Sequence, residues 1–100
     1  MPQHTTFINV FDVDPTKQQE LIDVLREGLE QIISHRPGFI SATLFASADG
    51  SRVVNIAIWK HPGDAQSTQA DPKAARFASR AAALAVAQPG LFTTVGVYEA

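Results

Sequence analysis

The sequence contains no cysteine, which excludes disulfides, thiolate metal sites, iron–sulfur clusters and a thiol nucleophile. The net charge is also small: eight basic and ten acidic residues give a formal net charge of −2. We therefore expect binding neither to nucleic acid nor to an anionic membrane. No apolar run is long enough to span a bilayer, and the N-terminal residues lack the basic and apolar parts of a leader peptide. These absences predict a cytoplasmic protein with one domain at 1–100.

The most informative stretch is 52–60, which is rich in β-branched and aromatic residues and follows an Asp-Gly turn signal. Side chains alternate between the two faces of a strand. One face of this stretch is wholly aliphatic, and the other carries Asn55 and Trp59 with the small Ala57 between them. A buried amide is costly unless it is hydrogen-bonded. Asn55 is therefore expected either to have a partner in the protein or to face a flat ligand.

The rest of the chain shows alternating strand and helix patterns. A strand at 6–13 again has one aliphatic face and one face with aromatic residues and an asparagine. A helix begins after an Asp-Pro pair, carries an apolar stripe and ends at His-Arg-Pro-Gly. Further elements are expected as a strand at 39–46, the strand at 52–60, a short helical turn at 64–69, an alanine-rich helix from 72 to about 87 and a last strand at 92–99.

The order β-α-β-β-α-β predicts an α+β, ferredoxin-like domain with a four-stranded antiparallel sheet and both helices on one face. Simple alternation along 39–46 puts Ile40 and Leu44 on one face, and Phe39 and Phe45 on the other. Two helices cover only one face of a sheet, yet both faces are apolar in this pattern. A large exposed apolar face usually indicates a partner. We therefore expect a homodimer in which two sheets pack face to face as a dimeric α+β barrel.

Three segments, in this order and spacing, resemble the antibiotic biosynthesis monooxygenase domain, a family of dimeric α+β barrels. The segments are Phe7-Ile8-Asn9-Val10-Phe11, His35-Arg36-Pro37-Gly38-Phe39 and Asn55-Ile56-Ala57-Ile58-Trp59. The resemblance covers nearly the whole chain. By position and spacing, Asn9, Asn55 and Trp59 are similar to the active-site residues of cofactor-independent oxygenases that convert polyketide anthrones to anthraquinones. The resemblance thus implies that these three residues are catalytic.

The resemblance implies an enzyme that oxidises an electron-rich polycyclic phenol or anthrone to a quinone in polyketide or other secondary metabolism. Dioxygen would be the co-substrate and no cofactor would be needed. The sequence has no cluster with metal-ligand spacing and no phosphate-binding glycine loop, so the electrons are expected to come from the substrate. The amide and indole N–H groups are donors suited to a developing oxyanion. The expected substrate-binding residues are Phe7, Phe11, Phe45, Phe77 and Arg80, with Arg76 as the alternative to Arg80.

The chain departs from some members of the family around the site. Those members also use a histidine, whose position corresponds to Phe45, and a tyrosine, which is absent from the segment after Trp59. An asparagine is not an effective base, so the acceptor of the substrate proton is unassigned. His61 is interpreted as an exposed turn residue, and Tyr98 either packs at the dimer edge or reaches the site.

Other functions are compatible with part of the pattern. A quinol monooxygenase or an isomerase would use the same site on a different substrate, and a non-catalytic dimeric barrel would only bind a small molecule. Trp59 and the two asparagines can also be structural residues. A haem-degrading monooxygenase is disfavoured. Such enzymes need an axial histidine about three helical turns beyond the tryptophan, where this chain has residues 66–70 and no histidine.

Overall fold

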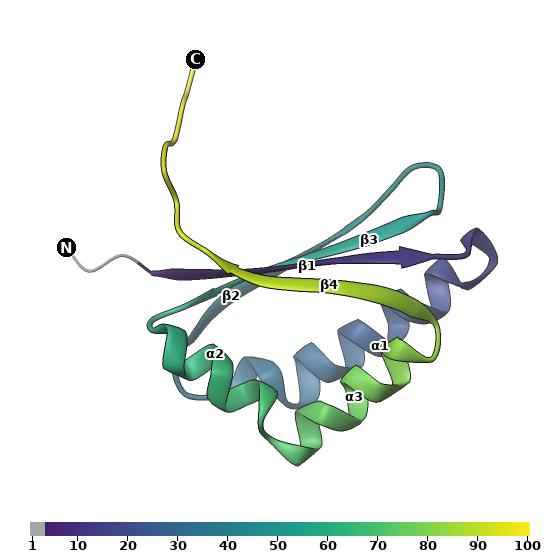
Figure 1. The fold of residues 1–100 in the computed structure, drawn as a ribbon, viewed down its shortest axis with the longest axis horizontal. Coiled ribbons are helices and arrows are strands. Elements are labelled where there is room, and N and C mark those ends of the chain that lie inside the picture. The colour runs from purple at the N-terminus through teal and green to yellow at the C-terminus, as the bar shows by residue number, and fades with distance from the viewer. Residues whose placement is uncertain (1–3) are drawn as a thin grey trace.

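The computed structural model describes residues 4–100 and shows one four-stranded sheet covered on one face by helices (Figure 1). The elements are β1 (Thr5–Val13), η1 (Pro15–Lys17), α1 (Gln18–Gln31), η2 (Ile33–His35), β2 (Phe39–Ala46), β3 (Arg52–Trp59), α2 (Pro62–Gln69), α3 (Pro72–Ala82) and β4 (Ala85–Phe92). The strands are antiparallel in the order β2-β3-β1-β4. The predicted ferredoxin-like α+β fold is confirmed for the single chain.

The sequence predicts neither a membrane-spanning segment nor a leader peptide. Within residues 4–100, no helix combines the length and the apolar character that a membrane crossing needs. The expectation that the chain has no leader peptide rests in part on residues 1–3, which lie outside the described residues.

The helices on the covered face begin where the sequence predicts. The side chain of Asp14 accepts the backbone N–H of Thr16 at 2.9 Å and caps η1, which leads into α1. Asp71 accepts the backbone N–H of Lys73 at 2.8 Å and caps α3. A proline follows each cap, at a position where its missing N–H removes no helical hydrogen bond. The two caps therefore fix where both long helices start.

The hydrophobic core lies between the sheet and the helices α1 and α3. Its buried members are Phe11, Val13, Leu21, Val24, Val53 and Ala81. Gly28 allows α1 and α3 to approach closely, because a Cβ atom at this position would lie 2.9 Å from the Phe77 ring. The close contact places the ring of Phe77 between the two helices and the sheet, where the candidate site lies.

The turn between β2 and β3 is built around Asp49. Its carboxylate accepts the hydroxyl of Ser51 at 2.7 Å, the backbone N–H of Ser51 at 2.9 Å and the hydroxyl of Ser47 at 2.9 Å. These hydrogen bonds, those from Ser51 first, lower the pKa of Asp49 to about 2. The pKa is lower in the folded than in the unfolded chain. The ionised carboxylate therefore stabilises the turn above about pH 4, and this contribution is lost as the pH falls through about 2.

We expect Asp49→Asn to lower the urea midpoint at about pH 6 and to change it little at about pH 2. Asparagine keeps an oxygen that accepts hydrogen bonds but loses the charge that strengthens them. Urea unfolding of both proteins across this pH range checks the prediction, with Glu99→Gln beyond the last strand as the control. Parallel pH profiles for the native protein and Asp49→Asn would contradict it.

The C-terminal elements differ from the prediction. We expected a helix to about residue 87 and a strand at 92–99, but α3 ends at Ala82 and β4 spans Ala85–Phe92. β4 is an edge strand that pairs with β1 alone, and edge strands tolerate a proline such as Pro89 because one side has no ladder. The prediction was wrong because pairing with β1 outweighs the helix propensity of the alanines.

A β-bulge near the start of β2 also reverses an expected orientation. The register shifts between Phe39 and Ser41, which makes Ile40 the extra residue. Simple alternation puts Phe39 and Phe45 on one face. With the bulge, Phe45 instead pairs with Val54 on the face away from the helices. Phe39 remains on the helix side of the sheet.

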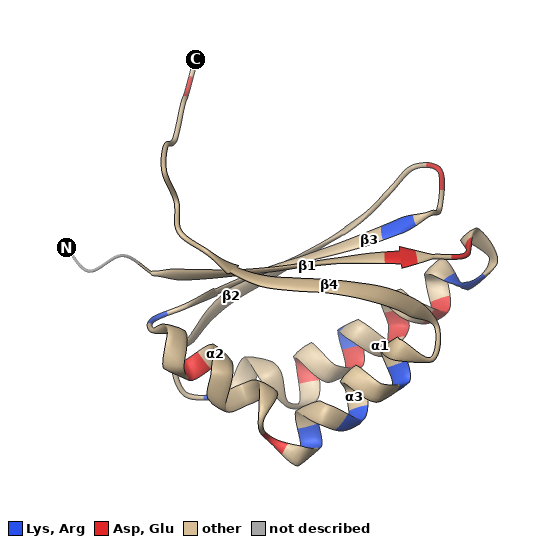
Figure 2. Ribbon diagram, viewed as in Figure 1, with Lys and Arg blue, Asp and Glu red and all other residues tan. Residues whose placement is uncertain are grey.

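The sheet face away from the helices is apolar, and none of the described elements covers it (Figure 1). Its large apolar side chains are Ile8, Val10, Phe45, Val54, Ile56, Ile58, Val86 and Phe92. The only charged residues in the strands are Asp12 and Arg52, at one end, while most charges lie on the helices and in loops (Figure 2). Beyond β4 the chain runs away from the sheet and leaves Val95 97% and Tyr98 92% exposed. The chain thus presents a broad apolar surface with its two charged side chains at one end.

Candidate active site

A cavity of about 350 Å³ lies between the sheet and the helices. β1 and β3 form its floor, the helices α1, α2 and α3 form its opposite wall, and Ala87 and Pro89 of β4 close one side. The volume lies within the range of about 300–1,000 Å³ that is common for small-molecule sites. Most lining side chains are aliphatic or aromatic. Those with polar atoms are Asn9, Asn55, Trp59, Thr68 and Gln69.

Asn9 and Asn55 lie side by side in the floor of the cavity. They are direct partners in the ladder between β1 and β3, and such partners have Cβ atoms about 5 Å apart. Both line the cavity. The alternation in each strand predicted that each asparagine lies on the aromatic face, and the observed register brings the two amides together.

The amide of Asn9 is held by the edge strand. Its Oδ1 accepts the backbone N–H of Gln88 at 3.1 Å, next to Pro89, which has no N–H of its own to donate. Because the oxygen is used in this bond, the NH2 group is the part of the amide that is left to donate. Asn9 therefore ties β4 to β1 and presents a donor in the floor of the cavity.

The amide of Asn55 has an unpaired acceptor. The residue is only 8% exposed, and its Oδ1 is shielded from solvent without a hydrogen-bond partner among the described residues. A buried acceptor left unpaired costs about 1–3 kcal/mol. Since Asn55 lines the cavity, a ligand that donates a hydrogen bond there would remove this cost. The described residues thus supply no partner for this oxygen, and the ligand alternative for Asn55 stays a prediction.

Trp59 forms an end wall of the cavity. It is 3% exposed and packs edge-on against Phe39, with the ring centroids 5.5 Å apart and 86° between the ring planes. Ala57 of β3 and Ala65 of α2 belong to the same cluster. Trp59 is therefore a core residue that also lines the cavity, so its structural and ligand-facing interpretations are compatible.

The four phenylalanines predicted to line the site divide into two groups. Phe7, Phe11 and Phe77 line the cavity. Phe45 does not, because the bulge in β2 places it on the opposite face, where it is 52% exposed. The prediction that Phe45 forms a wall of this cavity is therefore wrong.

Arg80 also lies outside the lining of the cavity. Its Nη2 is 3.2 Å from Oε2 of Glu27, and its guanidinium carbon lies 5.4 Å from the ring centroid of Phe77. Arg76 is exposed, and His61 is an exposed residue at the N-cap of α2. The predicted contact of Arg80 with substrate is not supported by this arrangement, because the side chain stacks on a residue of the wall instead.

The sequence interpretation missed the contribution of α2. Thr68 and Gln69 line the cavity, and the hydroxyl of Thr68 donates to the backbone carbonyl of Asp64 at 2.9 Å. Among the described residues, no ionisable side chain lines the cavity, and no group of three or more potential ligands is placed to hold a metal ion. The only sequence signal for this contribution was the abundance of small residues in 63–70, which leave room for a ligand between α2 and the sheet.

The fold and the cavity define the class of protein: a ferredoxin-like α+β domain that encloses a mostly apolar ligand site with an amide pair in its floor. The chain belongs to the antibiotic biosynthesis monooxygenase family, whose model matches residues 5–80. The family predicted from the sequence is thus confirmed.

The chain is similar to the tetracenomycin-F1 monooxygenase of Streptomyces glaucescens, with 47% identity over 72 residues. The match covers 72% of this chain and spans 64% of the length of that relative.

Two solved structures are similar over almost the whole chain. A variant of SnoaB, a cofactor-independent oxygenase from Streptomyces nogalater, has a TM-score of 0.83 and 28% identity, covering 95% of this chain and 96% of that one. The ActVA-Orf6 monooxygenase of Streptomyces coelicolor, in complex with nanaomycin D, has a TM-score of 0.86 and 28% identity, covering 99% and 94%.

Proposed function

We propose that this chain is a cofactor-independent monooxygenase that oxidises an electron-rich polycyclic phenol or anthrone to a quinone with dioxygen. The amide pair carries the proposal, because Asn9 offers a donor and Asn55 a buried, unpaired acceptor in an otherwise apolar cavity. The relatives support a polycyclic aromatic substrate and a place in antibiotic biosynthesis. They include a tetracenomycin-F1 monooxygenase and a monooxygenase in complex with nanaomycin D.

The amide pair suits a substrate that carries a carbonyl and a hydroxyl close together. The NH2 group of Asn9 donates to the carbonyl oxygen, and Oδ1 of Asn55 accepts from the hydroxyl. When the substrate loses a proton, its carbonyl oxygen becomes an oxyanion, which the donor of Asn9 stabilises. The indole N–H of Trp59 is the donor assigned to the oxygen-derived group, while its ring forms one wall.

The reaction balances with dioxygen as the only oxidant. The CH2 carbon of an anthrone loses a proton, and the resulting anion gives one electron to dioxygen. The radical pair combines through a new C–O bond to form a peroxide. The peroxide takes up one proton, and loss of water then breaks the O–O bond and the remaining C–H bond and leaves the quinone carbonyl. One dioxygen is consumed and one water is formed, and we propose water as the group that accepts the first proton and returns it to the peroxide.

We also propose that two copies of the chain form a homodimer through the uncovered sheet faces. The apolar surface that includes Ile8 and Ile56 is the proposed contact. Sheets that pack face to face lie about 10 Å apart, with their side chains interdigitated. The exposed Tyr98, on the segment beyond β4, is then available to a second copy.

Oxygen uptake by metal-stripped protein with dithranol, an anthrone, tests the proposed activity. The native protein is expected to consume oxygen and form the quinone without an added cofactor. The Asn55→Ala/Trp59→Phe double variant is expected to lose activity on the order of a hundredfold, because it lacks the acceptor and the indole N–H. Arg26→Ala, which removes only an exposed pair with Glu30, is expected to retain the native rate.

Two results would argue against parts of this proposal. Equal rates in the native protein and the folded double variant would show that Asn55 and Trp59 do not form the active site. No uptake above the spontaneous oxidation of dithranol would remove anthrones from the substrates. It would favour either a different substrate, as in a quinol monooxygenase, or a non-catalytic binding protein.

A further inference from the structure

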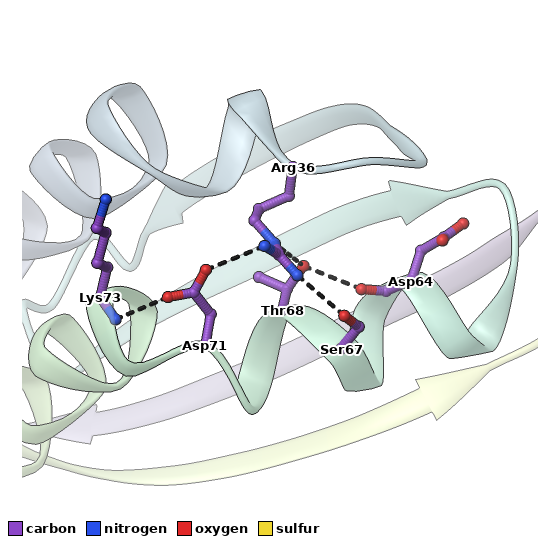
Figure 3. Close-up of polar contacts among 6 residues, drawn as sticks. All are labelled: Arg36, Asp64, Ser67, Thr68, Asp71 and Lys73. Atoms are coloured by element: carbon purple, nitrogen blue, oxygen red, sulfur yellow. Dashed lines mark hydrogen bonds and ion pairs between the residues drawn. The ribbon is translucent and has the colours of Figure 1, made fainter.

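Arg36 connects the end of η2 to the corner between α2 and α3 (Figure 3). Its Nη1 donates to Oδ2 of Asp71 at 3.0 Å, and its Nη2 donates to the hydroxyl of Ser67 at 2.9 Å. Its Nε lies 3.4 Å from Oγ1 of Thr68, which is long for a hydrogen bond. One guanidinium group therefore contacts three side chains of the same corner.

Asp71 links Arg36 to the start of α3. Its Oδ1 accepts the backbone N–H of Lys73, while its Oδ2 accepts from Arg36. The two side chains of this ion pair are 26% and 18% exposed, compared with 62% and 70% for the surface pair of Arg26 and Glu30. Water therefore screens the Arg36–Asp71 pair less than the surface pair. Removing Arg36 would leave a partly buried carboxylate without its cation.

The corner that Arg36 holds forms one end of the cavity. Thr68 and Gln69, in the last turn of α2, line the cavity together with Ala65. Ile33, three residues before Arg36, lines it as well. α2 has little apolar anchorage of its own, because its only buried residues are Ala65 and Thr68, and an alanine methyl buries little surface. The position of this wall therefore depends on polar contacts.

We propose that Arg36 is a positioning residue that, through Asp71, holds the α2–α3 corner against the bound substrate. A flat ligand stays in place only if the wall above it is kept at a fixed distance from the sheet. Without the guanidinium group, the end of the cavity at Thr68 and Gln69 widens, while the amide pair in the floor is unchanged. The inference relies on the proposed function for the identity of the ligand, but it can be tested by binding alone.

Trp59 is the only tryptophan of the chain, so its fluorescence reports binding at the cavity without turnover. The probe is the dihydroxyanthraquinone that forms from dithranol, a flat molecule that quenches indole emission. We expect Arg36→Ala to raise its dissociation constant about tenfold. Asp71→Asn should act in the same direction, although asparagine keeps the cap of α3. The double variant should bind the quinone no more weakly than the weaker-binding single variant, because both substitutions break the same contact between Arg36 and Asp71. Arg26→Ala is the matched control and should bind like the native protein.

A second measurement keeps the inference testable if quenching is small. Amide hydrogen exchange over 62–71 should be faster in Arg36→Ala than in the native protein and in Arg26→Ala, because the corner opens more often. Native-like exchange and native-like quinone binding in Arg36→Ala would each overturn the proposal, as would additive effects of the two substitutions.

The experiment separates this inference from the proposed function. If the native protein oxidises no anthrone but Arg36→Ala still weakens quinone binding, Arg36 positions the wall and the oxygenase proposal fails. If the native protein oxidises dithranol and Arg36→Ala binds and turns over like it, the oxygenase stands and the role of Arg36 is overturned. If the native protein oxidises dithranol and Arg36→Ala weakens quinone binding, both proposals stand. The loss of activity in Arg36→Ala then appears mainly as a higher KM for dithranol.

Discussion

Asn55→Leu is expected to make the protein more stable while removing most of its activity. Leucine has two methyl groups where asparagine has its oxygen and nitrogen, so the branched shape is retained. The change removes a buried amide oxygen that has no partner among the described residues, and we expect a gain of about 1 kcal/mol in unfolding free energy. The substrate hydroxyl loses its acceptor, and turnover of dithranol should fall on the order of a hundredfold.

The same substitution at Asn9, the partner of Asn55 on β1, is a matched control for which we expect the unfolding free energy to fall instead of rise. Asn9→Leu removes the acceptor of the Gln88 N–H, whose hydrogen bond joins β4 to β1, so we expect a loss of about 0.5–1.5 kcal/mol. Urea unfolding of the two variants, followed by oxygen uptake, measures both effects. A destabilised Asn55→Leu would mean that the amide oxygen is satisfied in the folded protein, and an active one would remove Asn55 from the mechanism.

The opposite changes in unfolding free energy expected at Asn9 and Asn55 illustrate what the sequence reveals about the site. Period-two alternation places each asparagine on the aromatic face of its strand, and this was enough to predict that both lie on that face. Alternation cannot show which residue lies opposite another, because register depends on turns and neighbouring strands. The hydrogen bond from Gln88 depends on that register and on the position of β4, so it was not predictable.

Phe45 shows where alternation fails. A bulge adds one residue to a strand and exchanges the two faces beyond it. The extra residue, Ile40, comes two positions after Gly38, whose φ of +83° marks an irregular entry into β2. Nothing in the spacing of apolar residues signals the bulge, since Ile40 is as well suited to a strand as its neighbours. The error at Phe45 is therefore local and leaves the strand order unaffected.

The C-terminal strand was misplaced for a different reason. The alanine-rich sequence after Pro72 favours helix at most positions up to Gln88, and Pro89 argues against a central strand. Both arguments are local. β4 forms because the edge of β1 that β3 does not use is available for pairing, and β4 pairs with it from Thr6 to Val13. Arg36 is a similar case, since it and Asp71 are far apart in sequence and only the packed fold brings them together. Local chemistry predicted most of the elements and the resemblance predicted the family, whereas tertiary contacts determined where the C-terminal elements end and how the cavity is closed.

Ile56→Glu is expected to convert the proposed homodimer into a monomer. Ile56 pairs with Ile8 on one side and Thr43 on the other, in the middle of the uncovered sheet face. In a dimer the new carboxylate would be buried without a cation, which costs several kcal/mol, so the dissociation constant should rise by a factor on the order of a thousand. In the monomer this face is open to water, so the variant should stay folded.

Sedimentation velocity at micromolar concentration, with circular dichroism as the test of folding, distinguishes the outcomes. Gln31→Glu adds the same charge at an exposed position of α1 and should leave the mass unchanged. Ile56→Val keeps the face apolar and should remain dimeric. A native protein that sediments as a monomer, or an Ile56→Glu variant that stays dimeric, would show that the sheet faces do not form the interface. Because the cavity lies on the other side of the sheet, quinone quenching of Trp59 in the Ile56→Glu monomer then measures whether one chain holds its ligand alone.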